Sequence, residues 1–223
     1  IYAIKPVGTI ERPRETVSAR YLLNGIDLDM IIKASDRQQL VGSDSNIIEV
    51  TTEPRNDAVI DDEFEQYLND APFIESRNNL IQETASRIVT GKSNRLDSLN
   101  ALSEWVFRNI EKRPSAGIPS ALAVLNTRQG DCNEHSVLFT ALARSLGIPT
   151  RIQLGVVYQD GRFYYHAWTA SLVDGRWLEF DPTFGLIRAD AARIALVSGD
   201  MRDAQQLAGV VGRIEIEIIE SER

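Results

Sequence analysis

Two Asp-Gly pairs, at 160–161 and 174–175, separate three short stretches that are rich in β-branched and aromatic residues, at 150–158, 163–173 and 176–180. An Asp-Gly pair between two such stretches predicts a two-residue type I′ turn, because this turn needs positive φ at both central positions. Two turns of this kind force the three strands into an antiparallel meander. This meander is the strongest constraint on the fold of the chain.

Most of the sequence before the meander is helical in pattern. Apolar residues recur at helical spacing over 74–89, 96–110 and 132–146, and a shorter helix is predicted at 119–126. Gly147 and Pro149 are typical of a helix end and of the segment that follows it. We therefore predict an α+β fold in which a helical subdomain packs on an antiparallel sheet.

The two ends of the chain carry further β pattern. Strands are predicted at 17–23 and 46–52, and the alternation of Ile214, Ile216 and Ile218 predicts a closing strand at 210–219. A helical stretch is predicted at 189–207. We expect residues 1–56 to form a β-rich N-terminal region, the tail of a domain that starts upstream, and residues 57–223 to form the domain that carries the chemistry.

Composition excludes several classes of function. The formal net charge of −8 disfavours nucleic-acid binding. A single cysteine excludes an intramolecular disulfide and a cysteine-based zinc site, and we expect no metal and no cofactor. No run of 18 apolar residues is present, so no membrane span is expected in this chain. The sequence gives no sign of an oligomeric state. The start at Ile1 is interpreted as a fragment or a mature chain, and the β-rich start favours an exported or periplasmic protein.

The single cysteine, Cys132, is a candidate nucleophile. Asp131 is a plausible N-cap, which places Cys132 in the first turn of the 132–146 helix. A helix N-terminus stabilises a thiolate and lowers its pKa, and its free N–H groups can hold an oxyanion. The alternative is a buried, inert cysteine. The polar residues on both sides of Cys132 argue against that alternative.

A thiol nucleophile needs a base, and the chain has two histidines. His135 lies on the same helix as Cys132 and is assigned a structural role, because parallel side chains on one helix do not converge. His166 lies mid-strand in the meander. With the turn at 174–175, residues whose numbers sum to about 349 lie opposite each other, so Asp181 is one diagonal step from His166 on the same face. A carboxylate there can orient the imidazole. The alternatives are a core histidine and a strand-end turn residue.

The order and spacing of these residues resemble a known family. The segments Gly130-Asp131-Cys132-Asn133-Glu134-His135, His166-Ala167-Trp168 and Trp177-Leu178-Glu179-Phe180-Asp181-Pro182-Thr183 are similar to the cysteine, histidine and aspartate motifs of the bacterial transglutaminase-like superfamily. The spacings agree as well, with 34 residues from Cys to His and 15 from His to Asp. The resemblance extends over about residues 60–188.

The resemblance implies a papain-like fold with Cys132 as nucleophile, His166 as base and Asp181 as the residue that orients the base. It implies an acyl transfer on an amide or peptide bond of a protein or peptide substrate, through a thioester, and favours hydrolysis. The alternatives are a protein-crosslinking transglutaminase and a non-catalytic binding or scaffolding module. The candidates for the oxyanion hole or the cleft are Gln129, Asn133 and Trp168.

Overall fold

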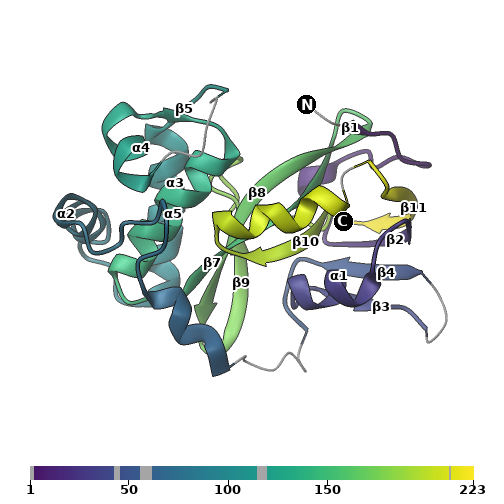
Figure 1. Cartoon of the computed structure of the whole chain (residues 1–223). Coiled ribbons are helices and arrows are strands. Elements are labelled where there is room, and N and C mark those ends of the chain that lie inside the picture. Colours follow the sequence, from purple (N-terminus) through teal and green to yellow (C-terminus); the bar gives the residue numbers. More distant parts are fainter. Residues whose placement is uncertain (1–2, 43–45, 56–61, 115–119, 211) are drawn as a thin grey trace.

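A central antiparallel sheet organises the molecule, which we describe from a computed structural model (Figure 1). The structure describes residues 3–42, 46–55, 62–114, 120–210 and 212–223. The strand order of this sheet is β1-β8-β7-β10, and β9 also pairs with β8. Its strands are β1 (Ala3–Ile4), β7 (Thr150–Gln159), β8 (Arg162–Val173), β9 (Arg176–Phe180) and β10 (Arg193–Gly199).

The predicted meander is confirmed as β7, β8 and β9. Both residues of each Asp-Gly pair have positive φ, with values of 50° and 79° at Asp160 and Gly161 and of 48° and 79° at Asp174 and Gly175. These are the angles that a type I′ turn needs. Thr169 pairs with Phe180, so the register of β8 and β9 is also the predicted one.

The helices on the N-terminal side of the meander form one group, seen at the left of Figure 1. They are α2 (Asn79–Ile88), α3 (Arg95–Asn109), α4 (Ala121–Thr127) and α5 (Cys132–Ser145), with the 3₁₀ helix η2 (Asp62–Leu68) before them. Helix α5 contacts α2, α3 and α4 as well as β7 and β8. Every residue from Glu134 to Arg144 is therefore buried, which makes α5 a core helix. In the part of the chain that the structure describes, no helix is long and apolar enough to cross a bilayer.

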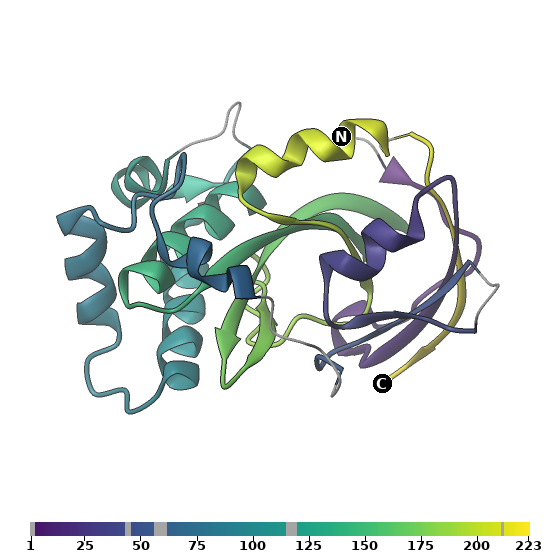
Figure 2. The same cartoon turned by 60° about the horizontal axis from the view of Figure 1, so that its bottom comes forward.

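A second sheet combines the two ends of the chain. Its order is β11-β2-β4-β3, formed by β2 (Ser18–Asn24), β3 (Gln38–Leu40), β4 (Ile47–Thr51) and β11 (Glu215–Glu222). The strands expected at 17–23, 46–52 and the C-terminus are all present. Helix α1 (Leu28–Ala34) packs on β10, as the view in Figure 2 shows. The 3₁₀ helix η1 (Pro13–Glu15) precedes β2, and the short strands β5 (Glu111–Lys112) and β6 (Gln129–Gly130) pair with each other.

Both ends of the chain thus pair with strands from other parts of the sequence. The C-terminal strand β11 pairs with β2, and β1 pairs with β8 of the central sheet. The division of the chain at residue 56 stays a prediction.

The helix predicted at 189–207 is wrong. Residues 193–199 form strand β10, which pairs with β7, and the 3₁₀ helix η3 (Met201–Gly209) follows. The residues from 189 to 197 are buried on both faces of the sheet. A strand buried on both faces has a continuous apolar sequence instead of an alternating one, and such a sequence is easily taken for a helix.

One edge of β8 has a gap between its two neighbours. Strand β1 pairs with Phe163 and Tyr164, and β9 begins to pair at Thr169. Among the described residues, no strand pairs with residues 165–168 along this edge. Backbone groups that point to this edge are therefore free to contact the N-terminus of α5, which packs on β8.

Candidate active site

The start of α5 is fixed by a capping box. The Asp131 carboxylate accepts the N–H of Asn133 at 2.9 Å, and the Glu134 carboxylate accepts the N–H of Asp131 at 2.9 Å. A Cβ atom at Gly130 would lie 2.1 Å from Cβ of Glu134, so this position requires glycine. Nδ1 of the buried His135 lies 2.6 Å from the carbonyl oxygen of Asp131. The structural role assigned to His135 is consistent with this contact.

The thiol of Cys132 lies in the gap on the edge of β8. Its Sγ accepts a hydrogen bond from the backbone N–H of Ala167, the residue that follows His166. Burial raises the pKa of Cys132 to about 12, the negative charges of Asp131, Asp181 and Glu134 add to this, and the Ala167 hydrogen bond acts against it. Burial therefore acts against the lowered thiol pKa that the helix N-terminus predicts.

His166 and Asp181 meet as the hairpin register predicts. Nε2 of His166 lies 2.8 Å from Oδ2 of Asp181, and both side chains are buried. Nε2 donates its proton to the carboxylate, which leaves Nδ1 as the proton acceptor of the neutral ring. The other oxygen of Asp181 accepts the N–H groups of Thr183 and Phe184, at 3.0 and 3.1 Å.

A buried arginine that the sequence analysis missed contacts the same carboxylate. Nη1 of Arg193 lies 2.7 Å from Oδ2 of Asp181, and its Nη2 lies 2.7 Å from Oδ2 of Asp190. Burial alone raises the pKa of Asp181, but the attraction of His166 when its ring is protonated, the positive charge of Arg193 and the hydrogen bonds from both side chains outweigh burial and hold that pKa well below its usual range. Arg193 lies in the segment that was predicted as a helix. Its signal in the sequence is a single arginine inside an apolar run, next to Asp190.

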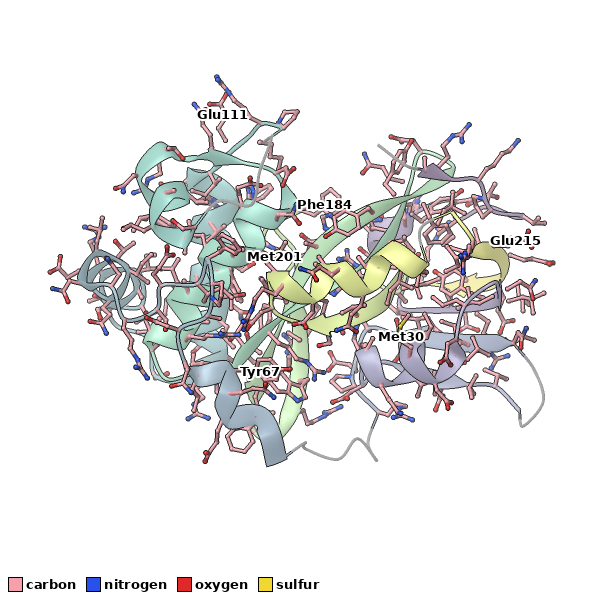
Figure 3. All side chains as sticks on the ribbon, viewed as in Figure 1. Met30, Tyr67, Glu111, Phe184, Met201 and Glu215 are labelled. Atoms are coloured by element: carbon pink, nitrogen blue, oxygen red, sulfur yellow. The ribbon has the colours of Figure 1, made fainter. Side chains whose placement is uncertain are left out.

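Two aromatic rings enclose the His166 imidazole. Phe184 stacks on it with a centroid distance of 4.9 Å, and Trp168 stacks with a centroid distance of 6.1 Å. Phe184 lies between the helical group and the sheet (Figure 3). Trp168 is fully buried, and its Nε1 donates to Glu179 at 2.7 Å. The structure therefore does not place Trp168 in a cleft or an oxyanion hole.

The other two oxyanion candidates lie on either side of Asp131. Gln129 is exposed, in the short strand β6. Asn133 is partly buried, and its Oδ1 accepts a hydrogen bond from the Tyr165 hydroxyl at 3.4 Å. Both residues stay candidates.

Tyr165, the residue before His166 in β8, lies beside the Cys132 thiol. Burial raises the pKa of its hydroxyl, and the nearby Cys132 and Asp131 raise it further. The ring of Tyr165 also lines an apolar cavity of about 240 Å³.

Within the described ranges, no group of three or more His, Cys, Asp or Glu side chains is arranged to hold a metal ion.

Comparison with known proteins identifies the core. The model of the transglutaminase-like superfamily matches residues 82–182, a range that contains Cys132, His166 and Asp181. An uncharacterized protein of Haemophilus influenzae is 26% identical over 143 residues, which are 60% of this chain. The match covers 37% of that protein, so this chain spans less than two-fifths of its length.

A solved structure has the same fold, and a second is similar to part of the chain. A Cytophaga hutchinsonii protein, described as a candidate cysteine protease, is 16% identical with a TM-score of 0.61, over 100% of this chain and 86% of that one. The periplasmic domain of TgpA from Pseudomonas aeruginosa is 20% identical with a TM-score of 0.48, over 63% of this chain and 55% of that one. The Cytophaga protein shows a common fold over the full length. The family model matches residues 82–182, so this range of the chain is similar to the core of the transglutaminase-like superfamily.

Proposed function

We propose that this chain is a cysteine-dependent acyl-transfer enzyme that acts on an amide or peptide bond through a thioester on Cys132. One observation carries the proposal. Sγ of Cys132 accepts a hydrogen bond from the N–H of Ala167, the residue directly after His166, and Nε2 of His166 is held by Asp181. This arrangement supplies a nucleophile, a proton acceptor and a group that orients the acceptor.

The proposed reaction has two steps. In the first, the Cys132 proton passes to Nδ1 of His166 while Sγ bonds to the carbonyl carbon, and the N–H of Cys132 in the first turn of α5 stabilises the oxyanion. His166 then gives this proton to the leaving amine as the C–N bond breaks. In the second step His166 takes a proton from water as the water oxygen bonds to the thioester carbon. The C–S bond then breaks, the acid is released, and the proton returns from His166 to Sγ of Cys132.

The raised pKa of Cys132 favours one version of this reaction. At neutral pH the resting thiol carries its proton. The proton is therefore transferred to His166 during the attack, and a stable thiolate is not formed beforehand. The same observation favours the second candidate function, a binding or scaffolding module whose thiol does not react.

Hydrolysis is the proposed outcome for the thioester. Support comes from the Cytophaga protein of the same fold, which is described as a candidate cysteine protease. A primary amine that replaces water as the second reactant gives a protein crosslink instead, and this is the alternative outcome. The preference for an exported protein and for a protein or peptide substrate also stays a proposal.

The test is the capture of an acyl group on Cys132. The chain is incubated with an activated acyl ester, quenched in acid, digested and analysed by mass spectrometry. We expect an acyl adduct on the Cys132 peptide in the wild type, none in Cys132→Ala, and at least a hundredfold slower acylation in His166→Gln, because general-base catalysis contributes about 10²–10⁴-fold. His135→Gln, which replaces the other histidine, is the matched control.

Two results would count against the proposal. If His166→Gln is acylated as fast as the wild type, His166 is not the base. If no adduct and no amide turnover are found in the wild type, the binding module is favoured. Addition of a primary amine then separates the two enzymatic outcomes: the thioester goes to the free acid in a hydrolase, and to the amide of the added amine in a transferase.

A further inference from the structure

Arg193 and Asp181 form the most enclosed ion pair of the site. Both side chains have 0% exposure, and Nη1 of Arg193 lies 2.7 Å from Oδ2 of Asp181. That same oxygen accepts the Nε2 proton of His166 at 2.8 Å. Two donors, one guanidinium and one imidazole, therefore share one carboxylate oxygen.

The orientation of Asp181 depends on this arginine. Its Oδ1 is held by two backbone N–H groups of the following turn, at Thr183 and Phe184. Its Oδ2 is held by Arg193 on one side and faces His166 on the other. Because the guanidinium is a planar donor with fixed geometry, it fixes the rotation of the carboxylate before the imidazole binds to it.

The charges around His166 form a nearly neutral set. Asp181 and Asp190 are negative, and Arg193 pairs with both. Arg14 pairs with Asp190 at 2.9 Å, and its guanidinium lies over the Phe184 ring that stacks on the imidazole. Two positive charges thus already balance two negative charges while His166 is neutral.

We propose that Arg193 is a positioning residue of the active site, which orients Asp181 toward His166 and limits the stabilisation that Asp181 gives to the protonated imidazole. This inference rests on the proposed function. An imidazolium that is stabilised too strongly holds its proton and does not give it to the leaving amine. With Arg193 on the same oxygen, the proton that His166 takes from Cys132 remains transferable.

The other titratable groups near the pair include His135, which interacts with Asp181, and Tyr21, which interacts with Asp190 and Arg193. The Cys132 thiol lies at the N–H of Ala167, the residue after His166, and Asp131 and Glu134 are close to the thiol. The Tyr165 hydroxyl lies on the same side as Cys132. The Arg193, Asp190 and Arg144 variants leave these groups unchanged. A shift of the His166 titration midpoint in those variants therefore does not come from these groups.

The chain has only two histidines, so the His166 imidazole can be followed directly by NMR. A His135→Gln sample assigns the ring signals, and no substrate is needed. In Arg193→Met we expect the midpoint of the His166 titration to move to higher pH by about one pH unit or more, because the imidazolium then pairs with a carboxylate whose charge is no longer shared.

Arg144→Met is the matched control for the loss of a buried guanidinium. The Arg144 side chain also has 0% exposure and pairs with an aspartate, Asp200, at 2.6 Å, but it does not contact the site. We expect the His166 midpoint in Arg144→Met to equal that of the wild type. Arg193→Lys keeps the charge and should return the midpoint close to the wild-type value.

A variant with the opposite expectation covers the case in which Arg193→Met does not fold. Asp190→Asn removes one negative charge from the set and leaves Arg193 with Asp181 as its only anionic partner. The His166 midpoint should then move to lower pH. An unchanged midpoint in a folded Arg193→Met or in Asp190→Asn would overturn the proposal, and so would a shift in Arg144→Met as large as that in Arg193→Met.

Failure of the proposed function gives a different pattern. If the midpoints shift as expected but no variant forms an acyl adduct, Arg193 sets the state of His166 in a protein that is not an acyl-transfer enzyme. If acylation occurs, we expect Arg193→Met to lower the rate of the acylation step about tenfold or more with little change in the substrate concentration at half-maximal rate, because Arg193 does not touch the substrate.

Discussion

The state of the Cys132 thiol can be tested by alkylation, because the chain has no other cysteine. The perturbation is unfolding: the same thiol is compared in the native chain and in the chain in concentrated guanidinium chloride. Its pKa in the native chain is raised by burial from the ordinary 9.0 to about 12. Only the thiolate reacts, so three pH units correspond to an approximately thousandfold lower reactive fraction at neutral pH.

The assay is the rate of carbamidomethylation by iodoacetamide between pH 6 and pH 11, followed by mass spectrometry of the intact chain. We expect the unfolded chain to reach a plateau above about pH 9. The native chain should react about a thousandfold more slowly at pH 7, and its rate should still rise tenfold per pH unit beyond pH 9. This continued rise separates a raised pKa from simple steric protection, which lowers the plateau without moving it.

One result would refute a raised pKa of Cys132 in the native chain. If native Cys132 reacts at pH 6–7 as fast as the unfolded chain or faster, a thiolate–imidazolium pair exists in the resting site. The helix N-terminus would then outweigh burial, and the attack would start from a preformed thiolate. A slow native rate that levels off near pH 9 would mean that access to the sulfur, and not its pKa, controls the reaction.

Two further predictions concern neighbours of the nucleophile. Tyr165→Phe removes the hydroxyl beside Cys132 but keeps the ring. We expect acylation to slow about two- to tenfold with the melting temperature nearly unchanged, because one partly buried hydrogen bond contributes about 0.5–1.5 kcal/mol. Tyr164→Phe on the other strand face is the control, and equal rates in both variants would contradict a role for Tyr165. Gly155 of β7 lies opposite His166 of β8, and a Cβ atom at Gly155 would lie 2.1 Å from the carbonyl oxygen of Ile194. Gly155→Ala should therefore destabilise the fold by about 1–3 kcal/mol in urea unfolding. An unchanged unfolding midpoint would contradict this.

The His166–Asp181 pair is the part of the site that sequence reasoning located best. A two-residue turn fixes the register of both strands, so the position of Asp181 relative to His166 follows from counting residues. The position of Cys132 against this pair does not follow from counting. It depends on how α5 packs on β8, and on the gap that β1 and β9 leave along that strand.

Arg193 shows where the sequence misled. Its segment consists of small and aliphatic residues that fit a helix as well as a buried strand, and local preference alone favoured the helix. The segment forms a strand because it pairs with β7, and this pairing satisfies the hydrogen-bonding groups of its buried backbone. Only this pairing brings Arg193 to Asp181.

The sequence by itself determined the antiparallel meander, the capped start of α5 and the approach of Asp181 to His166, because turns, caps and hairpin register are set by residues close together in the chain. The tertiary structure alone decided the burial of the Cys132 thiol, the burial of Trp168 behind His166 and the sharing of Asp181 with Arg193. These depend on burial and on charges brought together from distant segments, and desolvation and Coulomb energies are set by distances in space.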